Sequence, residues 1–109
     1  ANPRAELHIW EARAKIQLRL AARVTVLTGE ATADRWASVP ESARVSYGTD
    51  PRPGSVIDHV YAYEKPPCPD RFAVLRCALE RIDLVHLDTR HRRARYLRET
   101  NWSGEWLAP

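Results

Sequence analysis

The chain has 109 residues, which is enough for one domain with a modest hydrophobic core. Hydrophobic residues make up 44% of the chain and charged residues 28%, a composition typical of folded soluble proteins rather than disordered segments. No apolar run approaches the roughly 18 to 20 residues that a membrane-spanning helix needs, and the polar start does not resemble a signal peptide. We therefore expect one domain over residues 1–109, in the cytoplasm, with no membrane partner.

The chain contains no methionine, so its first residue is not an initiator. We expect either that it was cut from a longer protein or that part of that protein is absent here.

Residues 5–28 carry the alternation of apolar and polar side chains that is typical of β-strands. Residues 7–10 alternate briefly and residues 15–27 alternate more clearly. Apolar side chains there occupy even positions, namely Ile16, Leu18, Leu20, Val24 and Val26. Polar side chains occupy odd positions, namely Gln17, Arg19, Arg23 and Thr25. The pattern predicts two antiparallel strands joined near residues 11–14, with one face on a core and the other polar.

The next segment has helical spacing. Three apolar residues within 33–37 recur at i, i+3 and i+4, which predicts a short amphipathic helix. The segment from Ser38 to Glu41 has the form of a capping box, in which both side chains would cap a second helix. We expect that helix to run to about Tyr47 and to stop at Gly48.

Residues 48–71 hold five of the eight prolines and show no periodicity. We expect a long loop here, with at most a short element at residues 56–63. Loops of this length inside compact domains are often functional. A lid and a contact with a second subunit are the two roles that we consider.

The C-terminal third is again strand-like. Residues 72–87 alternate, with apolar positions odd as far as Leu79 and even from Ile82 onward, a change of phase that indicates a β-bulge near residues 80–82. A last long strand is predicted over residues 91–99, followed by a turn at residues 101–104 and a short end.

Two strand pairs separated by two small helices and a loop indicate a mainly β, α+β fold. The pattern favours a small antiparallel barrel, or half of one, with a Greek-key-like long connection. Four or five strands cannot close such a barrel. We therefore expect the strand edges to pair with strands outside this chain.

Several kinds of site are not indicated by the sequence. The four histidines lack the spacing of a zinc motif, so we expect no metal site. There is no G-x-S-x-G motif and no cysteine flanked by charge-stabilising residues. Cys68 and Cys77 do not form a C-x-x-C pair, and we expect both to be reduced thiols.

Arginines cluster near the C-terminus, where residues 86–98 include five arginines and one acidic residue, Asp88. On the last predicted strand, His91, Arg93 and Arg95 share one face. Planar guanidinium groups match phosphate oxygens or the pyrimidine edge of a flavin. A phosphorylated ligand, RNA and plain solvent are the three candidate partners. Because aromatic residues do not alternate with the arginines and no RNA-binding signature is present, we do not expect nucleic acid.

Gln17 lies on the polar face of the second predicted strand. Its amide group both donates and accepts hydrogen bonds, which suits a flavin edge that presents both kinds of group. The alternative is an ordinary exposed strand glutamine with no ligand.

Four separated segments together resemble the FMN-binding split-barrel family of the pyridoxamine 5′-phosphate oxidase kind. They are residues 1–10, residues 16–20 (Ile-Gln-Leu-Arg-Leu), residues 33–40 (Ala-Asp-Arg-Trp-Ala-Ser-Val-Pro), and a C-terminal signature running from Ile82-Asp83-Leu84 through Arg92-Arg93-Ala94-Arg95-Tyr96 to the ending Leu-Ala-Pro. Their order and approximate spacing agree with the family, and the resemblance covers essentially the whole chain.

The resemblance implies an antiparallel split β-barrel homodimer that binds two FMN molecules at the subunit interface. It implies FMN contacts from Gln17 and Arg95, with Arg95 favouring negative charge on the reduced ring. Ser55 is also expected near the flavin, and His91 and Arg93 are expected to bind the substrate. The family's main FMN phosphate-binding residues lie on earlier strands, which precede Ala1.

The sequence departs from the family near its C-terminus. Pyridoxamine 5′-phosphate oxidases have an Arg-x-His pair where this chain has His91-Arg92-Arg93, and a tryptophan near the flavin where it has Val85. We therefore expect an FMN-dependent oxidoreductase acting on a small molecule other than pyridoxamine phosphate, with an anion as one candidate. A flavin- or haem-binding carrier or sensor without turnover is the second hypothesis, and a basic RNA- or DNA-binding domain is the third.

Overall fold

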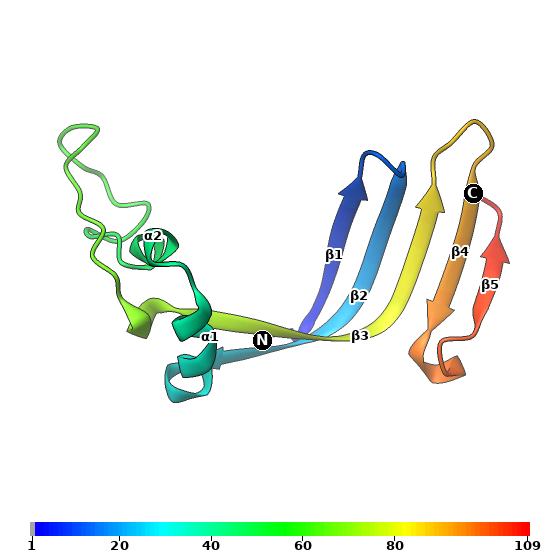
Figure 1. Ribbon diagram of the computed structural model, residues 1–109, viewed down its shortest axis with the longest axis horizontal. Coiled ribbons are helices and arrows are strands. Elements are labelled where there is room, and N and C mark those ends of the chain that lie inside the picture. The colour runs from blue at the N-terminus through cyan, green and yellow to red at the C-terminus, as the bar shows by residue number, and fades with distance from the viewer. Residues whose placement is uncertain (1) are drawn as a thin grey trace. The chain divides into compact units, whose positions relative to one another are not determined.

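The computed structural model describes residues 2–109, which contain five strands and two short α-helices. The strands are β1 (Arg4–Glu11), β2 (Ile16–Thr28), β3 (Ala73–His86), β4 (Arg92–Leu97) and β5 (Gly104–Leu107), and the helices are α1 (Ala33–Ser38) and α2 (Glu41–Arg44) (Figure 1). What the sequence predicts at Ala1 lies outside the described residues.

Internal contacts divide the chain into two compact units. Unit 1 comprises Ala1–Thr25 and Arg76–Pro109, and unit 2 comprises Val26–Leu75. The sequence predicts a single domain over residues 1–109, and this stays a prediction.

The five strands form one sheet in the order β1-β2-β3-β4-β5 (Figure 1). The ladders between β1 and β2, between β3 and β4, and between β4 and β5 are all antiparallel. Consecutive strands are therefore neighbours, and the predicted Greek-key-like connection is wrong: the long segment between β2 and β3 returns to the adjacent position in the sheet. The mainly antiparallel β fold with short helices is confirmed, and β1 and β5 form the two edges of the described sheet.

The β1–β2 hairpin forms where the sequence predicts it. In its ladder Glu6 lies opposite Ala21, His8 opposite Arg19, and Trp10 opposite Gln17. A four-residue turn connects the strands, and its last residue, Lys15, has a left-handed φ of 53°. Since opposite residues in a ladder share a face, the odd positions of β2 lie on the same face as the even positions of β1.

The other face of unit 1 is apolar but only partly buried. Ala22 of β2 and Ala94 of β4 are buried, whereas Leu7, Ile9 and Trp106 are 36%, 46% and 77% exposed. No large side chain among the described residues is fully buried. The predicted alternation of β2 is thus confirmed as a division into faces, while the core that it implies is thin within this unit.

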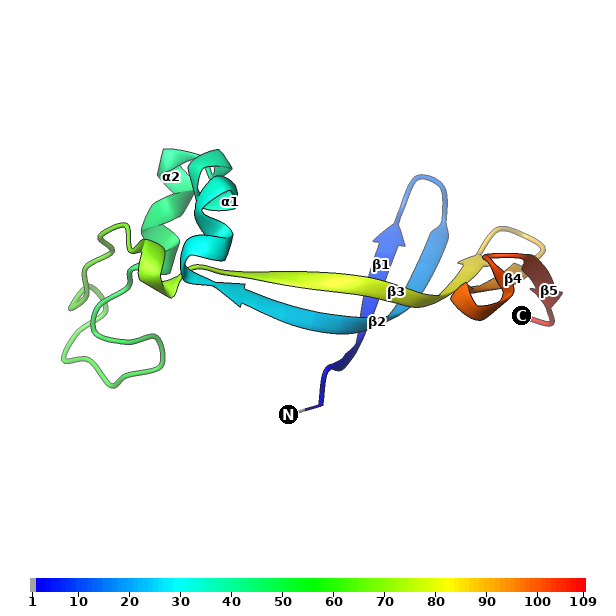
Figure 2. The same ribbon diagram turned by 90° about the horizontal axis from the view of Figure 1, so that it is seen from below.

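Unit 2 is built around three aromatic side chains beside the two helices, which lie next to each other in Figure 2. Trp36, Tyr47 and Phe72 pack with ring centroids 5.0 to 5.8 Å apart, in the edge-on and tilted geometries that aromatic pairs favour. The guanidinium of Arg44 lies 5.4 Å from the centre of the Trp36 ring. Of the apolar stripe predicted for the first helix, Trp36 packs in this cluster, whereas Ala33 and Ala37 are exposed.

The predicted capping box is wrong. Pro40 occupies the N-cap position of α2, and no side chain caps that helix. The Ser38 hydroxyl instead donates to the carbonyl oxygen of Arg35 at 2.7 Å, back within α1. A short serine side chain that satisfies the preceding turn is not available to the next helix.

The second helix is shorter than predicted and ends at Arg44. After α2 the chain continues as a 3-10 turn, Val45–Tyr47. Gly48 then has a φ of −120°, so it is not the left-handed terminator that its residue type suggests. A side chain here would meet the carbonyl oxygen of Pro66, because a Cβ atom would lie 1.4 Å from it. Glycine is required by that close approach.

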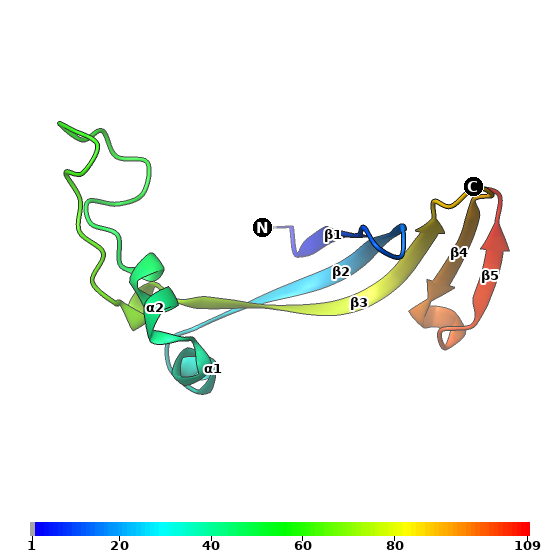
Figure 3. The same ribbon diagram turned by 45° about the horizontal axis from the view of Figure 1, so that its top comes forward.

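The long loop is present, and residues 56–63 form only bends and turns, so the short element considered there is not found in the described chain. The last long strand is shorter than predicted. It ends at Leu97, and Arg98–Thr100 form a 3-10 turn. Asn101 and Trp102 take left-handed φ values of 52° and 61°, which reverse the chain into β5 alongside β4 (Figure 3).

Candidate functional site

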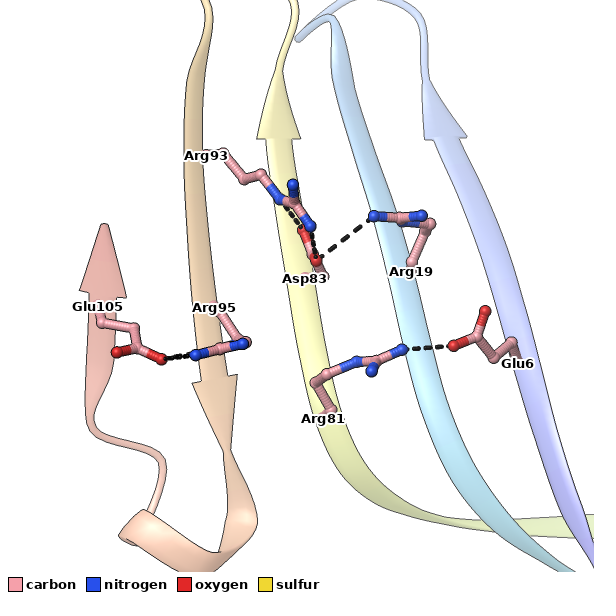
Figure 4. A network of polar contacts seen from close by, with 7 residues as sticks. All are labelled: Glu6, Arg19, Arg81, Asp83, Arg93, Arg95 and Glu105. Carbon is pink, nitrogen blue, oxygen red and sulfur yellow. Dashed lines mark hydrogen bonds and ion pairs between the residues drawn. The ribbon is translucent and has the colours of Figure 1, made fainter. Parts of the chain in front are cut away.

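One face of the unit 1 sheet gathers charged and amide side chains from all five strands, and we call it the polar face. The ladders place Asp83 opposite Arg95, and Arg95 opposite Glu105. The charged residues of this face are Glu6, Arg19, Arg81, Asp83, Arg93, Arg95 and Glu105 (Figure 4). Gln17 belongs to the same face because it lies two residues before Arg19 on β2.

Asp83 is the centre of the polar face. Its side chain is only 6% exposed, and it lies between arginines of the two neighbouring strands (Figure 4). From β4, Arg93 donates through Nε to Oδ1 at 3.0 Å and through Nη2 to Oδ2 at 2.7 Å. From β2, Arg19 donates through Nη2 to Oδ2 at 3.4 Å. The contact from Arg93, with two parallel hydrogen bonds, has the geometry in which guanidinium and carboxylate bind most strongly.

These contacts shift the charges of both partners. The hydrogen bonds from Arg93 hold the pKa of Asp83 below its usual value, although burial of the carboxyl opposes the shift. The same hydrogen bonds raise the pKa of Arg93. Asp83 is therefore a charged carboxylate at neutral pH, and it fixes the direction of the Arg93 guanidinium.

Arg95 makes a more exposed pair at the sheet edge. Its Nε donates to Oε1 of Glu105 at 2.7 Å, and its Nη2 donates to the same oxygen. The two side chains are 38% and 51% exposed. Because a guanidinium has five N–H groups and one carboxylate oxygen takes two of them, Arg95 keeps donors for a ligand.

Two consecutive residues of β3 pair with the β1–β2 hairpin. Arg81 Nη2 donates to Glu6, and Arg23 lies 3.4 Å from Glu80. Glu6 and Arg23 lie on the same face of the hairpin, whereas consecutive residues of a regular strand point to opposite faces. The two pairs are consistent with the predicted change of phase, and the β3–β4 ladder itself is regular from Arg81 to His86.

A cavity of about 890 Å³ opens at this end of the polar face. It is lined by Arg4, Ala5, Glu6, Ala21, Ala22, Glu80, Arg81, Leu97, Arg98 and Glu99. The Nε of Arg81 is buried and has no hydrogen-bond partner among the described residues. A buried donor without an acceptor is costly. Arg81 therefore carries one unsatisfied N–H, and the same residue lines the cavity.

The structure brings three of the five predicted site residues onto one face. Gln17, Arg93 and Arg95 all lie on the polar face, half-buried. His91 is exposed and precedes β4, so the face that it shares is not fixed by the ladder. Ser55 lies in the loop of unit 2, exposed, with its backbone N–H donating to Arg52 at 3.0 Å. The roles given to these residues stay predictions.

The sequence interpretation overlooked Asp83 and Arg81 as members of the site. One signal was present: Asp83 is a single acidic residue inside the apolar run from Ile82 to Val85. An acid in such a run must find a cation if it is buried. No comparable signal distinguishes Arg81, because its partners depend on the pairing of β3 with the hairpin.

Within residues 2–109, no group of three histidine, cysteine or acidic side chains is arranged to hold a metal ion. In the same residues, no helix has the length and apolar character needed to cross a membrane.

The polar face fits the flavin that the resemblance implies. Gln17 supplies an amide, and Arg95, which is 38% exposed, supplies spare N–H groups. These groups can meet the carbonyl oxygens and ring nitrogens of an isoalloxazine edge. The carboxylates of the face are each already paired with an arginine, so they do not oppose an anionic ligand.

Comparison with known proteins supports the fold. No protein-family model matches the chain, and no curated protein matches it. A solved structure does match, that of a pyridoxamine 5′-phosphate oxidase-related, FMN-binding protein from Nostoc punctiforme PCC 73102. The match has a TM-score of 0.76 and 23% sequence identity, and it covers 98% of this chain. The chain spans 63% of the length of that protein. The two chains therefore share a fold, as the sequence resemblance implies.

Proposed function

We propose that this chain forms part of an FMN-dependent oxidoreductase whose flavin lies against the polar face. One observation carries the proposal: Gln17, Arg93 and Arg95 lie on a single face of a sheet whose fold matches that of an FMN-binding protein. The N–H groups that Arg95 keeps beyond its pair with Glu105 support the presence of a ligand on this face.

In this proposal the residues bind and orient, and FMN, when bound, supplies the transfer of a hydride or of electrons. Gln17 and Arg95 contact the flavin, and the charge of Arg95 favours negative charge on the reduced ring. Arg93, held by Asp83, faces a small anionic substrate other than pyridoxamine phosphate. His91 and Ser55 are the less constrained members of the site.

We also propose a homodimer, in which a second copy completes the flavin site. Arg95 and Glu105 on this face are 38% and 51% exposed, and the donors that the described chain supplies there all come from one sheet. Analytical ultracentrifugation with and without FMN tests this part. Saturable FMN binding by a protein that stays monomeric would contradict the homodimer.

The proposal is tested by FMN titration of the purified protein, followed by flavin fluorescence and visible absorbance. We expect saturable binding that weakens about tenfold in Arg95→Ala, since a charge-assisted hydrogen bond is lost. Unchanged spectra on titration would contradict the flavin site. Anaerobic reduction by candidate donors and reoxidation by air then separate an oxidoreductase from a carrier or sensor, which would bind flavin or haem without turnover.

A further inference from the structure

The turn between β3 and β4 carries cationic side chains that the polar face does not use. A cavity of about 520 Å³ lies there, lined by His86, Asp88, Thr89, Arg90 and Arg92. His86 and Arg92 lie opposite each other in the ladder, so they point away from the face that holds Arg93. We call His86, Arg90 and Arg92 the turn cluster.

The acidic residue that lines this cavity is already balanced. Asp88 Oδ1 accepts from the Lys15 ammonium at 3.2 Å and from the backbone N–H of Thr89 at 2.9 Å. The N–H of Thr89, together with Lys15, lowers the pKa of Asp88. The backbone N–H of Leu87 donates to the carbonyl oxygen of Lys15 at 2.8 Å, which ties this turn to the turn between β1 and β2.

The two arginines of the turn cluster have no carboxylate partner within the described chain. Arg92 Nη2 lies 2.7 Å from Nδ1 of His86. Because a guanidinium can only donate, Nδ1 is the acceptor in this contact. Arg90 makes no hydrogen bond or ion pair with any residue from 2 to 109. Both guanidinium groups therefore keep N–H donors that no described residue accepts.

We propose that the turn cluster binds a dianion of phosphate size, either inorganic phosphate or the phosphate end of a small molecule. With Asp88 and Lys15 cancelling, Arg90 and Arg92 leave two positive charges, which match a dianion. Guanidinium forks bind phosphate oxygens in pairs, and the Thr89 hydroxyl adds a donor. No phenylalanine, tyrosine or tryptophan lines the cavity, which favours a small phosphorylated compound over nucleic acid.

The site lies on the opposite face from the proposed flavin contacts, so the two proposals can fail separately. The experiment is an NMR titration of the ¹⁵N-labelled full chain without FMN, using sodium phosphate and sodium sulfate. Sodium chloride at matched ionic strength is the control. We expect saturable shifts confined to residues 86–92 with phosphate and sulfate, and no saturation with chloride.

Variants test the assignment to the two arginines. Arg90→Ala and Arg92→Ala should each weaken phosphate binding about tenfold, and the double variant should abolish it. Arg90→Lys should retain part of the affinity, because the charge remains. Arg52→Ala, which removes an exposed arginine in unit 2, should bind phosphate like the unmodified protein.

Three results would overturn the proposal: shifts that rise linearly without saturation, equal affinity in the double variant, or tighter binding of a single-stranded RNA than of phosphate at the same salt concentration. Arg92→Ala loses a contact with His86 and could disturb the turn. Arg90 has no such contact, so Arg90→Ala and the shift map of the unmodified protein still decide the question.

Discussion

The arginines of the polar face and those of the turn cluster have the same side chain but different partners. On the polar face, Arg19 and Arg93 bind the buried Asp83, and Arg95 binds Glu105. In the turn, Arg90 and Arg92 have no carboxylate among the described residues. The guanidinium groups of the polar face are fixed by ion pairs. Those of the turn cluster form no ion pair, and Arg92 has only its contact with His86.

Arginine can therefore stabilise the fold at one position and remain available to bind a ligand at another. A guanidinium that chelates a buried carboxylate is fixed in direction, and its removal exposes the carboxylate to an unfavourable environment. A guanidinium without a partner contributes little to folding and keeps its donors for a ligand. The contrast can be tested by removing members of each group.

Removal of Arg93 should have the largest effect on stability. Arg93→Ala leaves the buried Asp83 with only the longer contact from Arg19. We expect the free energy of unfolding to fall by about 2 kcal/mol, below the range of about 3 to 5 kcal/mol for fully buried pairs, because Arg93 is 29% exposed. Urea denaturation followed by circular dichroism measures the change. A loss below about 0.5 kcal/mol would show that Asp83 does not depend on Arg93.

Acidification should weaken the same interaction more gently, because a protonated Asp83 can still accept hydrogen bonds from Arg93. The pKa of Asp83 is lower in the folded state than its ordinary value of 3.8, so its contribution to stability is present above that value. The contribution is lost as the pH falls through the folded pKa. We expect the free energy of unfolding to fall more steeply below about pH 4 in the unmodified protein than in Asp83→Asn. Parallel slopes in the two proteins would contradict the role of Asp83.

Removal of Arg95 should affect ligand binding more than folding. Its pair with Glu105 is exposed on both sides, and such pairs contribute about 0 to 1 kcal/mol. We therefore expect Arg95→Ala to lower the free energy of unfolding by less than about 1 kcal/mol, well below the effect of Arg93→Ala. Urea denaturation of both variants under one set of conditions gives the comparison. Equal losses in the two variants would remove the distinction between buried and exposed pairs on this face.

Removal of Arg90 should have the smallest effect on stability. Arg90 is exposed and has no partner in the described chain, so we expect Arg90→Ala to change the free energy of unfolding by no more than about 0.5 kcal/mol. Thermal denaturation in phosphate and in chloride sharpens the comparison, because phosphate should raise the melting temperature of the unmodified protein more than that of Arg90→Ala. A large loss of stability in chloride would show that the turn depends on Arg90 for its structure.

The faces of the sheet could be predicted from the sequence. Because side chains alternate along a strand, the identity of the residues places Gln17 with Arg19, and Arg93 with Arg95, once a strand is assumed. This information is local and needs no knowledge of which strands pair. The limits of β4 were less accurate, since the residues after Leu97 have no strong preference against continuing as a strand.

The partners of those residues could not be predicted. The pairing of Arg93 with Asp83 depends on the register between β3 and β4, which no local pattern fixes. Ser38 shows the same limit in unit 2: its spacing to Glu41 fits a capping box, but its hydroxyl was already taken by the Arg35 carbonyl. Sequence patterns indicate which side chains are able to interact, and packing decides which of them do.

The ion pairs of Asp83 have a consequence for how the chain finds its native pairing. A slip of β4 by one residue that brings Ala94 into the place of Arg93 would turn Arg93 to the apolar face. The buried carboxylate would then lack its two-pronged partner, so misaligned sheets carry an electrostatic penalty that the native alignment avoids. Asp83 therefore disfavours this shifted register of β3 and β4, and it does so independently of any ligand.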